Sequence, residues 1–121
     1  MPSPALNIPP SQNTATVSAI NTTTNIISPS KYFVEPLIKG HEHLNLPTYA
    51  FLIQNKKLNK SILFDAGSRK DWWNFSPANV KAIDNAVPAL EIEKGIDEIL
   101  TEGGVGLDSI EAIVWSHYHW E

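Results

Sequence analysis

The sequence has no cysteine, and this absence narrows the chemistry that the chain can perform. Disulfide bonds, thiolate zinc sites and a cysteine nucleophile are all excluded. Any metal ion must therefore be held by histidine and carboxylate side chains.

Basic residues and long apolar runs are also scarce. Nine Lys and Arg residues stand against 13 Asp and Glu residues, giving a formal net charge of -4, and they form no basic stripe. We therefore expect no nucleic-acid partner.

No apolar run approaches the roughly 20 residues that cross a bilayer. No basic start precedes an apolar core, as it does in a secretory signal. We expect a cytoplasmic protein without a membrane partner.

The chain is divided into a tail and one domain. Residues 1–13 are rich in proline, serine and asparagine, which is typical of a disordered tail. Residues 14–121 fit a single domain, since domains commonly contain about 100–150 residues.

The order of apolar patterns predicts an α/β fold with a mixed sheet. Strands are expected over 14–20, 48–54, 61–65 and 112–115, and the polar stretch 21–30 is expected to be a loop. The short connection between the second and third strands predicts an antiparallel hairpin. Helical spacing over 78–87 and 90–102 predicts two helices. The apolar run 112–115 predicts a strand that is buried on both faces.

Two histidines, His117 and His119, follow this last strand. In extended backbone their side chains point the same way, so both rings could reach one metal ion. Neutral imidazole is a good zinc ligand, but a catalytic zinc usually has three protein ligands and a water. On spacing alone, two ordinary histidines at a strand end remain the alternative.

The segments Phe64-Asp65-Ala66-Gly67 and Ser116-His117-Tyr118-His119-Trp120 together resemble the metallo-β-lactamase superfamily, most closely its lactonase-like fungal hydrolases. The resemblance extends from about Thr48 to Trp120. It implies the N-terminal half of a four-layer αβ/βα sandwich, with one or two metal ions, usually zinc. It further implies that His117 and His119 bind the first metal, and that Asp65 orients these ligands without binding the metal itself. Without the resemblance, Asp65 could simply form a turn.

The family motif continues with Asp and then His, whereas this sequence has Glu121 and no residue after it. Glu121 therefore stands where the family has the aspartate that orients the attacking water, and it is a candidate third ligand. The catalytic set is incomplete. We expect a truncated, inactive fragment of a zinc-dependent hydrolase lineage whose full-length members act on a lactone, an ester or a similar small molecule.

Two further features bear on partners. Trp72 and Trp73 could line an apolar substrate pocket, or they could pack their loop against the core. Half of a sandwich would also leave an apolar sheet face without its partner, and we expect this face to include Phe51, Ile53, Leu63 and Val114. Such a face predicts self-association. The alternative function is a non-catalytic half-domain that binds a protein partner through the exposed sheet.

Overall fold

The computed structural model describes residue 9 and residues 11–117, which form one sheet and two helices. Along the chain these elements are β1 (Thr16–Pro29), β2 (His43–Asn55), β3 (Lys60–Phe64), α1 (Pro77–Ala86), β4 (Ala89–Ile92), α2 (Ile96–Glu102) and β5 (Ile110–Val114). Short 3-10 turns occupy Ser30–Tyr32, Trp72–Asn74 and Leu107–Ser109. Within these residues no helix is long and apolar enough to cross a membrane.

The sheet is mixed, as the sequence predicts. Its strand order is β4-β1-β2-β3-β5. The first four strands in this order pair antiparallel with their neighbours, whereas β5 pairs parallel with β3. The predicted hairpin of β2 and β3 is confirmed. Together with the two helices, this sheet makes an α/β fold.

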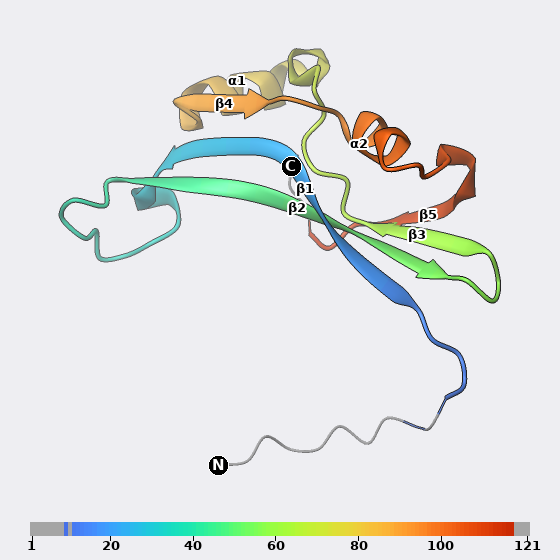
Figure 1. The fold of residues 1–121 in the computed structure, drawn as a ribbon. Coiled ribbons are helices and arrows are strands. Elements are labelled where there is room, and N and C mark those ends of the chain that lie inside the picture. The colour runs from blue at the N-terminus through green and yellow to red at the C-terminus, as the bar shows by residue number, and fades with distance from the viewer. Residues whose placement is uncertain (1–8, 10, 118–121) are drawn as a thin grey trace, which may run out of the picture.

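Both helices lie on the same side of the sheet (Figure 1). Beneath them is a small apolar core of four buried residues, Ala50, Leu52, Leu63 and Leu100. Partly buried residues from β1, the helix α2 and the segment after it pack around this core. The opposite face of the sheet carries no helix among the residues that the structure describes.

The prediction of a loop over residues 21–30 is wrong, because β1 continues through this stretch. Burial alternates along it, and the buried positions include Thr22, Thr24 and Ser28. These small polar side chains are tolerated inside because they form hydrogen bonds within the protein, so their polarity does not indicate solvent exposure. The strand pairs with β2 on one side and with β4 on the other.

The prediction of one helix over residues 90–102 is also wrong. Residues 89–92 form β4, which pairs with β1, and the helix α2 begins only after Gly95. The backbone N–H of Gly95 donates to the Glu98 carboxylate at 2.8 Å, which caps the start of α2. The predicted helix over 78–87 is confirmed as α1, with Ser76 accepting a hydrogen bond from the Asn79 N–H.

The strand β5 is not buried on both faces, contrary to its uninterrupted apolar sequence. It lies at the edge of the sheet, and Ile113 and Val114 are 59% and 42% exposed. An uninterrupted apolar sequence indicates that both faces of a strand are buried in the complete protein. Among the described residues, β5 is only partly buried.

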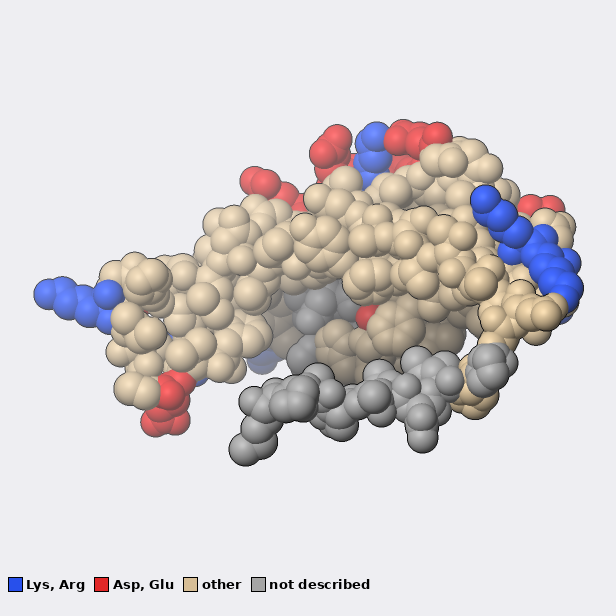
Figure 2. All heavy atoms as spheres, turned by 60° about the horizontal axis from the view of Figure 1, so that its bottom comes forward, with Lys and Arg blue, Asp and Glu red and all other residues tan. Residues whose placement is uncertain are grey.

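The face opposite the helices is apolar, and we call it the open face. Strand register places these side chains on it: Val17, Ala19, Tyr49, Phe51, Ile53, Ile62, Phe64, Ala112 and Val114. The rings of Phe51 and Phe64 meet edge to face, 6.4 Å apart. Leu63 was expected here and is not, because its side chain points into the helix-covered core and is 2% exposed. In the view turned toward this side, charged side chains lie mainly at the two ends and along one rim (Figure 2).

Candidate functional site

The turn after β3 has a backbone that its sequence explains. Asp65 and Gly67 both have positive φ, 58° and 65°. Aspartate is among the few non-glycine residues that enter this region readily. At Gly67 a Cβ atom would lie 2.6 Å from the Cβ of Thr22, so no larger residue fits there. The Thr22 hydroxyl donates to the Thr48 carbonyl at 3.0 Å, so the side chain against which Gly67 packs is itself held between β1 and β2.

Asp65 connects this turn to the end of β5. Its backbone N–H donates to the Val114 carbonyl at 2.9 Å. Its Oδ1 accepts a hydrogen bond from the Ser116 N–H at 2.8 Å. A carboxylate that accepts from a backbone N–H makes a comparatively strong bond. The half-buried Asp65 therefore holds the backbone directly before His117.

His117 lies just beyond this anchor. The Ser116 hydroxyl and the His117 Nδ1 are 2.7 Å apart, which makes a hydrogen bond whose direction depends on the tautomer. The partner of one ring nitrogen sets the orientation and the role of the other. Ser116 and Asp65 thus position the backbone and the ring of His117 together.

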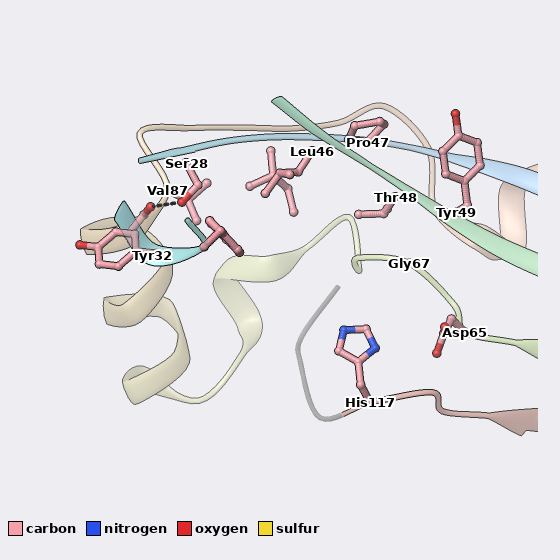
Figure 3. A pocket seen from close by; sticks show the side chains of 13 residues that line it. Ser28, Tyr32, Leu46, Pro47, Thr48, Tyr49, Asp65, Gly67, Val87 and His117 are labelled. Atoms are coloured by element: carbon pink, nitrogen blue, oxygen red, sulfur yellow. Dashed lines mark hydrogen bonds between the residues drawn. The ribbon is translucent and has the colours of Figure 1, made fainter. Parts of the chain in front are cut away.

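Asp65 and His117 both line a cavity of about 480 Å³. Figure 3 shows them facing it from neighbouring loops at one end. The other lining residues are mostly apolar and come from β1, β2, the turns after β1 and β3, and the end of α1: Ile26, Ser28, Tyr32, Phe33, Leu46, Pro47, Thr48, Tyr49, Gly67, Ala86 and Val87. Cavities of roughly 300–1,000 Å³ with a few convergent polar groups are typical of small-molecule sites.

The remaining predicted site residues have different outcomes. His119 and Glu121 lie outside the described residues. Trp72 and Trp73 do not line this cavity. Trp73 lines a second hollow beside the helix α2, and its ring meets that of Trp72 edge to face at 6.3 Å. Their role in substrate binding stays a prediction.

Most of the apolar wall was missed from the sequence. Ile26 and Ser28 fall in the stretch read as a loop, and Val87 was visible only as a helix residue. Tyr32 and Phe33 gave the one available signal, an apolar pair in an otherwise polar region. Both are more than half exposed, which suits a cavity wall better than a core.

The donor set near the cavity fits part of a metal site. His117 offers an imidazole, a ligand type that zinc accepts, whereas the Oδ1 of Asp65 accepts a hydrogen bond from the Ser116 N–H. However, the part of the chain that the structure describes contains no group of three or more His, Cys, Asp or Glu side chains that could hold a metal ion. The described residues therefore supply an incomplete ligand set.

A charged cluster lies in the loop after the turn, next to the second hollow. Arg69 forms two hydrogen bonds of 2.6 Å with the Asp71 carboxylate, and the Asn74 amide donates a third at 2.9 Å. These contacts, that of Arg69 first, hold the pKa of Asp71 well below its ordinary value. Charge-assisted hydrogen bonds of this kind are strong, so Arg69 and Asn74 together stabilise the conformation of this loop.

Comparison with known proteins gives relatives for nearly the whole chain. The gamma-lactamase FDB1 of Fusarium pseudograminearum is 37% identical over 98% of this chain and 30% of its own length. The metallo-hydrolase mfmC of Annulohypoxylon moriforme is 33% identical over 99% of this chain and 32% of its own length. The cytochrome P450 monooxygenase mpaDE' of Penicillium brevicompactum is 37% identical over 98% of this chain and 14% of its own length. No family model and no solved structure matches.

These relatives confirm the resemblance read from the two motifs. The chain is a partial region of a metallo-β-lactamase-type protein. It spans less than a third of the length of the gamma-lactamase and metallo-hydrolase relatives named above. The five-stranded sheet with helices on one face agrees with an incomplete domain of this class.

Proposed function

We propose that the chain carries the first part of the zinc site of a hydrolase that opens a cyclic amide or a cyclic ester. His117 and His119 are the proposed zinc ligands, Glu121 is a weaker candidate, and Asp65 is a positioning residue. The observation that carries the proposal is the hydrogen bond from Ser116 to Asp65, which holds the strand end before His117 beside a cavity. The relative named gamma-lactamase supports the amide, and the one named metallo-hydrolase supports the metal.

Zinc, when bound, would lower the pKa of water to about 7 and polarise the substrate carbonyl. The chain's own residues do the positioning. Asp65 fixes the backbone before His117, and Ser116 holds the ring nitrogen Nδ1. Groups that orient a ligating imidazole commonly affect metal affinity about 10- to 100-fold.

We further propose that these 121 residues do not hydrolyse substrate by themselves. A catalytic zinc usually needs three protein ligands, and the described residues supply no group of three. The relatives contain about three times as much polypeptide. The relative named cytochrome P450 monooxygenase is matched over only 14% of its own length, so its name assigns no activity to this chain.

Complementation tests this proposal. The 121-residue chain is mixed with the part of the gamma-lactamase FDB1 that lies outside the matched region, and hydrolysis of a γ-lactam is measured with zinc present. Activity is expected only in the mixture. It should be lost with His117→Ala and kept with His43→Ala, a control histidine at the far end of β2. Activity of the 121-residue chain alone, or a His117→Ala mixture as active as the unchanged one, would contradict the proposal.

A second candidate is a non-catalytic half-domain that binds another protein, or a second copy, through the open face. The supporting observation is that this face is apolar along four neighbouring strands, with the charged Lys60 only at its end, at the start of β3. Phe51 and Val114 are 38% and 42% exposed on it. Contiguous exposed apolar surface of this kind commonly marks an interaction site.

The second candidate is tested by sedimentation velocity over a range of concentrations. Self-association that is abolished by Phe51→Lys, but not by Leu58→Lys in the hairpin turn, would support it. Leu58 is a suitable control because it is 61% exposed and does not belong to the open face. A monomer at all concentrations that binds no partner would count against it.

A further inference from the structure

The cavity beside His117 has two ends of different character. Asp65 and His117 form one end, whereas Tyr32 and Val87 lie at the other (Figure 3). Leu46 lies between the ends, so the wall becomes apolar as it leads away from the polar pair. A single small ring does not need a cavity of about 480 Å³, which is in the size range that holds drug-sized ligands.

Two polar side chains of the cavity wall, those of Ser28 and Thr48, are already paired within the protein. The Ser28 hydroxyl donates to the Ala86 carbonyl at 3.0 Å. The Thr48 hydroxyl forms a short hydrogen bond with the Thr22 hydroxyl. These hydroxyl groups already have hydrogen-bond partners in the protein. This part of the cavity therefore favours an apolar substrate group over a polar one.

Charge points to the same class of substrate. None of the lining residues that the structure describes is lysine or arginine, and the carboxylate of Asp65 would repel an anion at the polar end. Tyr32 presents an aromatic ring at the far end, and its sequence neighbour Phe33 also lines the cavity. Aromatic rings pack well against flat apolar groups.

We infer that the substrate carries an uncharged apolar ring on its cyclic amide or ester, and that Tyr32, Phe33 and Val87 bind this ring. The inference rests on the proposed function, because it takes the end with His117 as the reacting end. Phe33, Tyr32 and Val87 are then specificity-determining residues that contact the part of the substrate remote from the carbonyl. One added apolar group in a fitting pocket is worth about 10- to 200-fold in discrimination.

The test compares two γ-lactams that differ by one ring, 1-phenylpyrrolidin-2-one and pyrrolidin-2-one, in an NMR titration of the 121-residue chain. The phenyl compound should bind at least about tenfold more tightly. It should shift the amide resonances of Tyr32, Phe33 and Val87, and leave unchanged those of Val17, Ala19 and Ala112, which belong to the open face and do not line the cavity. Equal affinities, or shifts confined to open-face residues that do not line the cavity, would overturn the inference.

Variants sharpen the test. Phe33→Ala should reduce the preference for the phenyl compound at least about fivefold, whereas Leu37→Ala should not. The two side chains are matched, because they are 56% and 57% exposed on the same loop and only Phe33 lines the cavity. Equal effects of the two variants would overturn the assignment of Phe33. Because the exposure of Phe33 makes misfolding an inadequate explanation for a change, the result reports on the cavity.

The same titration separates this inference from the proposed function. His117→Ala should weaken zinc binding at least about tenfold and leave the preference for the phenyl compound intact, because the ring is bound at the other end. If His117→Ala keeps both the preference and the zinc affinity of the unchanged chain, the assignment of His117 as a zinc ligand is contradicted and the substrate assignment is not. If the unchanged chain binds zinc but shows no preference for the phenyl compound, the substrate assignment is contradicted and the metal assignment is not.

Discussion

Replacing Gly67 by alanine should destabilise the protein more than any other glycine-to-alanine change at a positive φ. Gly67 has φ +65°, and an alanine Cβ there would lie 2.6 Å and 2.7 Å from the Cβ and Cγ2 of Thr22. The left-handed conformation costs a non-glycine residue about 1–2 kcal/mol. Overpacking against a side chain that cannot move costs a further 1–3 kcal/mol or so. Thr22 cannot move easily, since it is 2% exposed and bonded to Thr48.

The sum is about 2–5 kcal/mol, a large part of the free energy of unfolding of a small domain. Urea unfolding measures it. With a slope of about 2 kcal/mol per molar, the midpoint should fall by about 1–2.5 M at constant slope. Gly104→Ala is the matched control, because Gly104 has φ +75° and no atom within 4 Å of an added Cβ. It should lose only the conformational part. Equal midpoints for the two variants would refute the packing argument.

Two further predictions concern the loops around the site. Asp65→Ala should speed hydrogen exchange at the Ser116 amide, because its acceptor at 2.8 Å is lost, whereas Asp65→Asn keeps a carbonyl acceptor and should protect that amide; equal exchange in both variants would count against the anchor. Folding lowers the pKa of Asp71 through Arg69 and Asn74, so its contribution to stability is present above about pH 4 and is lost as the pH falls through the folded-state pKa. An NMR titration should find Asp71 ionised at pH 4, and Arg69→Gln should return its pKa toward the ordinary value.

The sequence predicted those elements whose local pattern and tertiary environment agree. The hairpin of β2 and β3 has alternating apolar residues and a short polar turn, and α1 has Ser76, then proline at its first position. The Asp-x-Gly turn was readable because its two positive φ angles demand particular residues. In each of these cases the structure depends on residues that are close together in the sequence, so the local pattern is enough to predict it.

The failures occurred where distant partners decide the structure. Residues 89–92 continue a helical pattern, but β1 offers them a strand edge. The polar residues Thr22, Thr24 and Ser28 suggested a loop, but hydrogen bonds across the sheet and to α1 satisfy two of them. Pairing over long sequence separations leaves no local pattern to read.

Two residues of the candidate site were named from the sequence, and their chemical roles stay predictions, whereas the shape of the cavity was missed. The motifs identified Asp65 and His117, which line the same cavity. The apolar end could not be foreseen, because Tyr32 and Val87 are brought together only by the fold. Trp72 and Trp73, the residues predicted to line a pocket, lie elsewhere among the described residues.

Zinc binding by the 121-residue chain tests the central claim most directly. Equilibrium dialysis with metal analysis compares the unchanged chain with His117→Ala, the double variant His117→Ala/His119→Ala and the control His43→Ala. The account predicts one zinc ion per chain, bound at least about tenfold more weakly in His117→Ala and unchanged in His43→Ala. Equal zinc affinity in the unchanged chain and in the double variant would contradict it.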